Sequence, residues 1–553
     1  MPRDKRSIPA RMRAPLVRYM KQYARTRERQ EAVLRGMVRR ARDTQFGRDH
    51  GFSSIRSPRD YGHRVPIRDW SELQGYFDRT FAGETAVLTA EQPLLYHQTS
   101  GTSGKNKMIP VTERCDRLSA RTHHIWVYKA MAENPGLMRG GVLGIVNGAL
   151  EGHSPAGVPV GSVSGNVFVR RMPSFVRRSY SHPHETTSIP DPDQRRYTLM
   201  RLAVQRPCSF IFTGNAGAIL NLFEFADMHA DRLIRDIHDG TLDCAAALNS
   251  AVRDAVRPFL HAQPERARAM EAGRKRAGRL SPADYWPGLS VIGCWLGGTV
   301  GRIAGQLRDW CPPQAVLRDI GYMASEGAFT IPAGNGQPDG TLALHSIFFE
   351  FVPVSEHIGP DTHALGAHEL VQDEEYQVVI TTTGGLYRYA INDIVRVTGF
   401  YDGSPLIRFV RKGEYVKNIA GELLNVDHVL DAMKTVGRDT GLRIRHLQVQ
   451  PRPEERRYAV HVELESSPPE AALRTLPERI DAELCRVNEV YAEVRRESLL
   501  EPVTAYLMHA GWLDAITSDW VASGRRESQF KPPVLVDRID HAEMTERQLG
   551  EVH

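Results

Sequence analysis

The sequence has few cysteines, no long apolar run and little net charge. Its six cysteines in 553 residues show no Cys-x-x-Cys spacing, which argues against a zinc site or a disulfide frame and favours a reducing compartment. No segment approaches the uninterrupted run of about eighteen apolar residues that a membrane helix requires. The N-terminus lacks the apolar part of a secretory signal. We therefore expect a soluble, cytoplasmic protein without a membrane partner.

The net charge is only +5, and much of the basic excess falls within residues 1–45. A basic segment of this kind can bind nucleic acid or a membrane, or act as a targeting helix. The alternative is an amphipathic helix that packs on the protein body. We favour packing and expect no nucleic-acid partner, because apolar residues recur there at helical spacing: Leu16, Met20, Tyr23, Leu34 and Met37.

The pattern of apolar residues changes along the chain. Residues 195–275 carry apolar residues at three- and four-residue steps, which predicts helices. From Trp286 onward, short apolar runs separated by turn residues predict strands. This order indicates an α/β fold with several sheets. The polar segment Arg411–Gly421 is a plausible junction, so we expect domains at 1–410 and 411–553.

A loop rich in Ser, Thr and Gly, QTSGTSGKNKMIPVT, spans Gln98–Thr112 after an apolar strand. Its glycines let the backbone approach a phosphate, its hydroxyls and amides can donate hydrogen bonds, and Lys105 or Lys107 supplies charge. A Walker loop is excluded, because Thr99 stands where that motif needs Gly and Asn106 where it needs Ser or Thr. An ordinary polar loop is the alternative. The predicted phosphate-binding residues are Thr99, Ser100, Gly101, Thr102, Ser103, Gly104 and Lys107.

Four further motifs follow this loop in order: GYMASEG (Gly321–Gly327), YRYAINDIVRVTGF (Tyr387–Phe400), FVRKGEYVK (Phe409–Lys417) and SQFKPPVLV with Lys531. The ordered series resembles the Gretchen Hagen family of acyl-acid amido synthetases, a branch of the adenylate-forming superfamily. The resemblance spans Val65 to Lys531. It implies a large multi-sheet N-terminal domain of the firefly-luciferase-like type and a smaller, mobile α/β C-terminal lid domain.

The resemblance also implies a nucleotide site for ATP and magnesium. Tyr322 matches the tyrosine that stacks on adenine, and Glu326 matches the glutamate that helps to hold Mg²⁺ on the phosphates. Asp393 matches the carboxylate that accepts hydrogen bonds from the ribose hydroxyls. Ser325 belongs to the same nucleotide-binding segment. Taken singly, Glu326 would be interpreted as a surface carboxylate and Asp393 as a turn residue.

The catalytic residues that the resemblance implies are Glu326 and two basic residues, Lys531 and Arg411. Arg411 matches the basic residue at the junction with the mobile domain. Lys531 matches the lysine that this domain brings to the reacting carboxylate and α-phosphate. Without the resemblance, Lys531 would be interpreted as a solvated surface side chain.

The segment Glu151–Gly165 resembles the family's stretch beside the acyl-acid pocket, although an ordinary connecting loop stays possible. Two positions depart from the commoner pattern. Asn392 stands where glycine is usual, which a left-handed asparagine tolerates, and Met323 adds bulk beside the site. The implied substrate-binding residues are Gly161, Ser162, Ser164, Met323 and Ala324.

A nearby His-rich segment, SHPHE, contains His182, His184 and Glu185. No partner ligands recur at metal-site spacing, so we expect a surface loop rather than a metal site.

Together these features predict ATP-dependent activation of a carboxylic acid as an acyl-adenylate, followed by transfer to an amine, in particular an amino acid, with release of AMP and pyrophosphate. One alternative is a thioester-forming ligase that uses the same adenylate. A second is a non-catalytic nucleotide-binding protein. The acid, the acceptor amine and the oligomeric state stay open.

Overall fold

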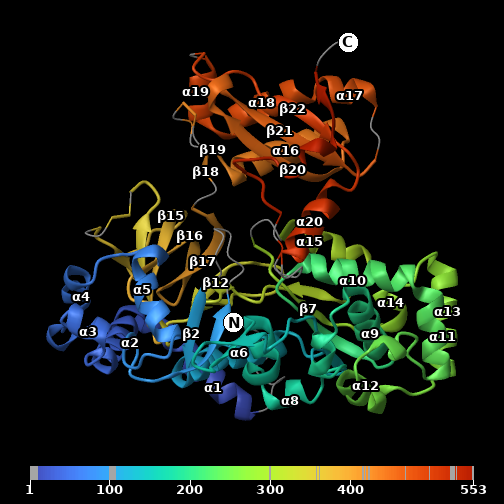
Figure 1. The fold of residues 1–553 in the computed structure, drawn as a ribbon, viewed down its shortest axis with the longest axis horizontal. Coiled ribbons are helices and arrows are strands. Elements are labelled where there is room, and N and C mark those ends of the chain that lie inside the picture. Colours follow the sequence, from blue (N-terminus) through green and yellow to red (C-terminus); the bar gives the residue numbers. More distant parts are fainter. Residues whose placement is uncertain are drawn as a thin grey trace. The chain divides into compact units, whose positions relative to one another are not determined.

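The computed structural model describes residues 10–98, 107–297, 301–356, 358–359, 362–413, 416–417, 419–420, 422, 424–466, 469–496, 498–523, 530 and 532–550. The chain forms two compact units, Met1–Val410 and Arg411–His553 (Figure 1). Among the described residues, no helix combines the length and apolar character needed to cross a membrane.

Within its described residues, the first unit contains three main sheets. A seven-stranded sheet has the order β11-β12-β17-β16-β15-β13-β14, and two four-stranded sheets have the orders β2-β1-β5-β4 and β3-β6-β7-β8. The short hairpin β9–β10 stands apart from them. The strands of these sheets and of the hairpin are β1 (Pro93–Gln98), β2 (Met108–Thr112), β3 (Gly141–Gly144), β4 (Gly152–His153), β5 (Pro159–Gly161), β6 (Cys208–Phe212), β7 (Val291–Gly293), β8 (Val316–Arg318), β9 (Met323–Ala324), β10 (Gly327–Ala328), β11 (Thr330–Pro332), β12 (Gly340–Leu342), β13 (Ile347–Pro353), β14 (Leu365–Gly366), β15 (Glu375–Thr382), β16 (Tyr389–Tyr401) and β17 (Ser404–Lys412).

The sheet β3-β6-β7-β8 is parallel, and its longest strand, β6, is buried at every position. Such burial on both faces is typical of a parallel sheet covered by helices. The green helices of Figure 1 gather around this sheet. The helices of the first unit are α1 (Ala10–Met20), α2 (Thr26–Ala41), α3 (Gln45–Asp49), α4 (Pro58–Arg64), α5 (Trp70–Phe81), α6 (Glu113–Glu133), α7 (Val163–Asn166), α8 (Ser174–Arg177), α9 (Pro192–Val204), α10 (Ala216–Met228), α11 (Ala230–Asp239), α12 (Ser250–Val256), α13 (Pro264–Ala277), α14 (Pro282–Tyr285) and α15 (Gly301–Gln306).

The second unit is a mixed sheet of order β20-β21-β22-β23 with helices packed on it. Its core joins Val449 and Val460 of the sheet to Ile480 of α18. Its elements are β18 (Val416–Lys417), β19 (Leu424–Asn425), α16 (Val426–Thr440), β20 (Ile444–Arg452), β21 (Arg457–Leu464), α17 (Glu470–Arg474), α18 (Leu476–Val487), α19 (Glu489–Arg496), β22 (Thr504–Met508), α20 (Trp512–Ala522) and β23 (Thr545–Leu549).

These elements confirm the expected α/β fold. The helical periodicity of residues 195–275 corresponds to α9–α13, interrupted by β6, and the short apolar runs after Trp286 become strands. Local signals explain the boundaries. For example, α5 begins with a capping box, in which Asp69 accepts from the amide of Glu72 and Glu72 accepts from that of Asp69.

The basic N-terminal segment packs on the protein, as expected, but it forms two helices rather than one. Tyr23, Leu34 and Met37 are buried in the core that contains strands β12 to β16. The buried side chain of Gln30 donates to the carbonyl oxygen of Ile347 at 2.9 Å and accepts from the amide of Phe349 at 2.8 Å. These contacts attach α2 to the start of β13.

The expectation of a surface loop at SHPHE is wrong for His182. Its side chain is 3% exposed, and its ring stacks on Phe168 at a centroid distance of 5.3 Å. Its Nε2 lies 2.9 Å from the carbonyl oxygen of Gly144, and its Nδ1 lies 3.1 Å from the hydroxyl of Thr186. His182 therefore ties this segment to strand β3, a long-range contact that local polarity does not reveal.

Candidate functional site

The segment Gly321–Gly327 forms the hairpin β9–β10, in which Ser325 and Glu326 occupy the turn. Its start is held firmly. Gly321 adopts a φ of +95°, and a Cβ there would lie 2.5 Å from the carbonyl oxygen of Thr330. The buried carboxylate of Asp319 accepts from the amides of Leu296 at 2.7 Å and Gly321 at 2.6 Å. The backbone that leads into Tyr322 is therefore fixed.

Tyr322 and Asp393 form the centre of the candidate site. Tyr322 is 8% exposed, and its ring contacts those of Phe329 and Phe409, at centroid distances of 4.5 and 5.5 Å. Its hydroxyl donates a hydrogen bond to the carboxylate of Asp393. Burial, followed by the charge of Asp393, raises the pKa of Tyr322 well above its usual value, so the phenol stays a donor.

Asp393 is 2% exposed and lies within β16, not in a turn. The register between β15 and β16 shifts here, because Gln377 pairs with Ile394 whereas Val379 pairs with Ala390. Asn392 sits in this bulge with a φ of +61°. Asparagine thus supplies the left-handed backbone that the sequence led us to expect, and the bulge directs Asp393 toward Tyr322.

Glu326 lies close to this pair. Its side chain is 9% exposed, and its charge contributes to the raised pKa of Tyr322. The structure therefore brings together three of the predicted residues, Tyr322, Glu326 and Asp393, from segments about seventy residues apart. An aromatic ring beside two buried carboxylates suits a base, a ribose and a phosphate-bound cation.

The glycine-rich loop itself, with Thr99, Ser100, Gly101, Thr102, Ser103 and Gly104, lies outside the described residues, as does Lys105. Its flanks are described: β1 and β2 pair as an antiparallel hairpin in which Gln98 faces Met108. The Nζ of Lys107 donates to the hydroxyl of Tyr389 at 3.0 Å. Since Tyr389 begins β16, Lys107 is attached to the strand that carries Asp393.

His97, the residue before Gln98 in β1, is a further residue of the site that is absent from the sequence-based prediction. It is 2% exposed, and its Nδ1 lies 3.2 Å from the carbonyl oxygen of Ser325. The backbone of His97 pairs with that of Gly161 in the parallel strand β5. His97 therefore links the start of the glycine-rich loop, the Ser325–Glu326 turn and the Glu151–Gly165 segment. A histidine within an apolar strand just before that loop was the available signal.

The serines of the Glu151–Gly165 segment use their hydroxyls to hold the segment itself. Ser162 is fully buried, donates to the carbonyl oxygen of Gly148 at 2.8 Å and caps α7 by accepting from the amide of Gly165 at 2.9 Å. Ser164 accepts from the amide of Asn147 at 3.2 Å. Contact of Gly161, Ser162 and Ser164 with an acid stays a prediction, as it does for Met323 and Ala324, which are half-buried in β9.

The two predicted basic residues are less completely described. Lys531 lies outside the described residues. Arg411 lies in β17, and its Nη1 donates to Asp427 at 3.3 Å, in the first turn of α16. Within the second unit, this contact connects the junction segment to its first helix.

Comparison with known proteins places this fold in a class. It is shared by a solved structure described as GH3.15 acyl acid amido synthetase, with a TM-score of 0.83, 19% identity and coverage of 100% of this chain and 99% of that one. Family models of the GH3 N-terminal, central and C-terminal domains match residues 16–316, 340–412 and 427–539. The chain belongs to the GH3 family.

Curated relatives extend over most of the chain. The indole-3-acetic acid-amido synthetase GH3.6 of Arabidopsis thaliana is 23% identical over 551 residues, which cover 92% of this chain and 88% of that protein. The 4-substituted benzoates-glutamate ligase GH3.12 of the same plant is 24% identical over 513 residues, covering 85% and 86%. These two relatives are named for different acids.

Proposed function

We propose that the chain is an ATP-dependent acyl-acid amido synthetase, which activates a carboxylic acid as an acyl-adenylate and joins it to an amino acid. The observation that carries this proposal is the buried group of Tyr322, Glu326 and Asp393 in a chain that belongs to the GH3 family. The names of the relatives, amido synthetase and benzoates-glutamate ligase, support the amide as product. The acid and the amino acid are left open.

In the first half-reaction, a carboxylate oxygen of the acid attacks the α-phosphorus of ATP, and the bond to pyrophosphate breaks. Asp393 accepts from the ribose hydroxyls, and the ring of Tyr322 supports the base. The loop 99–107 donates hydrogen bonds to the leaving pyrophosphate, and Lys531 neutralises the two anions as they approach. The role of these residues is positioning and charge compensation, so no nucleophilic side chain is required.

Glu326 is the residue that would hold Mg²⁺, and a carboxylate next to the triphosphate site is the hard oxygen ligand that this cation prefers. The bound cation would neutralise phosphate charge. The buried position of Glu326 beside Tyr322 fits the role of a magnesium ligand, because a buried carboxylate is stabilised by a partner cation.

In the second half-reaction, the amine nitrogen attacks the acyl carbon, the bond to the adenylate oxygen breaks, and AMP leaves. We assign the unit 411–553 as the lid domain, which withdraws Lys531 before the amine enters, and Arg411 as a residue of its junction. Segment 1–410 is then the domain that binds ATP and the acid.

The absence of disulfides among the six cysteines supports a cytoplasmic location.

The proposal is tested by exchange of labelled pyrophosphate into ATP over a panel of acids, followed by mass spectrometry of products formed with amino acids or with coenzyme A. We expect exchange with at least one acid and an amide product. A thioester product would replace the amide proposal, and no exchange with any acid would indicate a non-catalytic nucleotide-binding protein.

The assigned role of Lys531 is tested by Lys531→Ala. We expect this variant to lose about a hundredfold or more of the exchange rate, because an uncompensated pair of anions must meet at the α-phosphorus. Lys434→Ala, at an exposed position of α16 in the same unit, is the matched control and should keep its rate. Normal exchange by Lys531→Ala would refute the assignment.

A further inference from the structure

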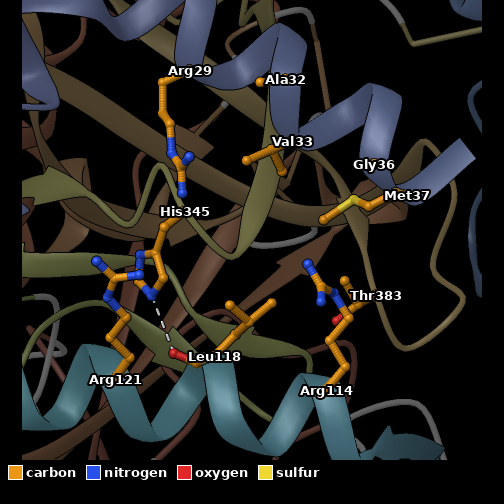
Figure 2. A pocket seen from close by; sticks show the side chains of 10 residues that line it. All are labelled: Arg29, Ala32, Val33, Gly36, Met37, Arg114, Leu118, Arg121, His345 and Thr383. Carbon is orange, nitrogen blue, oxygen red and sulfur yellow. Dashed lines mark hydrogen bonds between the residues drawn. The ribbon is translucent and has the colours of Figure 1, made fainter. Parts of the chain in front are cut away.

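A cavity of about 230 Å³ lies between α2 and α6 in the first unit. Arg29 comes from α2, Arg114 and Arg121 come from α6, and His345 and Thr383 complete the lining. Figure 2 shows Arg29 and Arg121 directed toward His345 at one end of the cavity, with Arg114 and Thr383 at the other. None of the residues assigned to adenylation lines it.

Most of the positive charge in this cavity is not matched by the protein. In the part of the chain that the structure describes, none of the three guanidinium groups forms an ion pair, and the buried Nε atoms of Arg29 and Arg114 have no hydrogen-bond partner. Glu31 pairs with Arg27 and Arg35, outside the cavity. Glu91 accepts from the backbone amide of Arg114, and its charge offsets part of that of the Arg114 guanidinium. Arg29 and Arg121 therefore face the cavity without a counter-charge, and Arg114 is only partly compensated.

The guanidinium groups lie close enough to repel one another when the cavity holds only water. Burial, followed by the charge of Arg121, lowers the pKa of Arg29. Burial, followed by the charge of Arg40, also lowers the pKa of Arg114, and the carboxylate of Glu91 opposes this shift only in part. His345 is held as a neutral ring, with its Nε2 3.1 Å from the carbonyl oxygen of Leu118. A bound anion would relieve the repulsion and supply acceptors for the free N–H groups.

The middle of the cavity defines the shape of the anion. Val33 and Leu118 lie between the two cationic ends, and Met37 lies near the end that carries Arg114 (Figure 2). This lining suits a short carbon chain, whereas the guanidinium groups suit phosphate or carboxylate groups. Arg121 is exposed, so the cavity is reached from solvent.

We propose that this cavity is a second binding site, specific for a small, doubly charged organic anion such as a phosphate monoester or a dicarboxylate. Arg29 and Arg121 bind one end of the anion, Arg114 and Thr383 approach the other, and the apolar middle accommodates its carbon atoms. The site goes beyond the proposed adenylation, and its occupancy does not require turnover.

The test uses the full-length protein and calorimetric titration with glycerol 3-phosphate, succinate and inorganic phosphate, with sodium chloride at matched ionic strength as the reference. We expect saturable binding of at least one organic dianion, stronger than that of inorganic phosphate. Arg29→Gln and Arg121→Gln should each weaken this binding about tenfold, because each removes a charge-assisted contact. The phosphate and carboxylate arms of the titration separate the two possible head groups.

Arg35→Gln is the matched control, since this residue lies on α2 but pairs with Glu31 and does not line the cavity. It should bind the anion like the unmodified protein, and Arg29→Lys should retain part of the affinity. Arg121→Gln changes an exposed side chain, so it keeps the test decisive if Arg29→Gln misfolds. Equal binding by Arg121→Gln and the unmodified protein, or no binding above the chloride reference, would overturn the proposal.

Discussion

At the scale of single residues, the proposed contact with the ribose depends on the buried carboxylate of Asp393. Asp393→Asn keeps an oxygen that can accept from Tyr322 but removes the negative charge. We expect the KM for ATP to rise about tenfold to a hundredfold, because a hydrogen bond to a charged group contributes about 1.5–3 kcal/mol. Steady-state kinetics of pyrophosphate exchange, with ATP varied, measures this change.

The matched control is Asp402→Asn, at an exposed position that follows β16 and has a φ of +50°, which asparagine tolerates. It should leave the KM for ATP unchanged. If Asp393→Asn also had an unchanged KM, the ribose would be bound elsewhere.

Individual residues differ in how far the sequence could predict them. The fixed order of their motifs identifies Tyr322, Glu326 and Asp393, and the structure brings them together. The local sequence identifies neither the burial of His182 nor that of His97, because strands from distant segments bury both. Polarity of the local sequence does not report such long-range burial.

At the scale of elements, the parallel contact between β1 and β5 determines the approach of the Glu151–Gly165 segment to the site. A Cβ on Gly161 would lie 1.8 Å from the carbonyl oxygen of Ala149, a distance that backbone cannot accommodate without moving. We expect Gly161→Ala to lower the free energy of unfolding by about 1–3 kcal/mol. Displacing β5 from His97 should also reduce adenylation, as denaturant unfolding and pyrophosphate exchange would measure.

Gly152→Ala is the matched control, because it lies in β4 of the same sheet and a Cβ there meets no atom within 4 Å. Its stability and activity should stay within experimental error of the unmodified protein. Equal stability of the two variants would mean that the segment adjusts freely around Gly161.

Elements with their own periodic or capped sequence were predictable. The strand before the glycine-rich loop and helices α9–α13 follow directly from apolar spacing. The cavity between α2 and α6 was not predictable, because Arg29 and Arg121 belong to helices that sequence periodicity treats separately. The cap that Ser162 forms on α7 is local, but its hydrogen bond to the carbonyl oxygen of Gly148 and its burial arise only in the folded chain.

At the scale of the whole molecule, buried histidines predict acid sensitivity. Burial lowers the pKa of His345 to about 3. It lowers the pKa of four further histidines to about 4: His123, His182, His446 and His461. In the unfolded chain each titrates near 6.5, so the unfolded state binds more protons between these values. The stabilisation from neutral histidines is complete above about pH 6.5 and is lost as the pH falls toward 4.

Denaturant midpoints measured between about pH 7 and about pH 5 should therefore fall steadily. Asp319 and Glu350 act in the opposite sense, because burial raises the pKa of Asp319 to about 6 and also raises that of Glu350, but these are two carboxyl groups against five histidines. His182→Gln should flatten the decline, whereas His238→Gln, at an exposed position, should leave it unchanged. A midpoint that stays constant over this range would contradict the prediction.

The packing of the N-terminal helices on the seven-stranded sheet has a consequence for synthesis of the chain. The side chain of Gln30 in α2 donates to the carbonyl oxygen of Ile347 across 317 residues of sequence, so α2 reaches its contacts with the sheet only after that length has been translated. At about 5–20 residues per second, this delay is on the order of tens of seconds. During that interval the apolar side chains by which α2 packs on the sheet have no sheet to cover them, so a chaperone that binds apolar segments of the nascent chain could bind this helix.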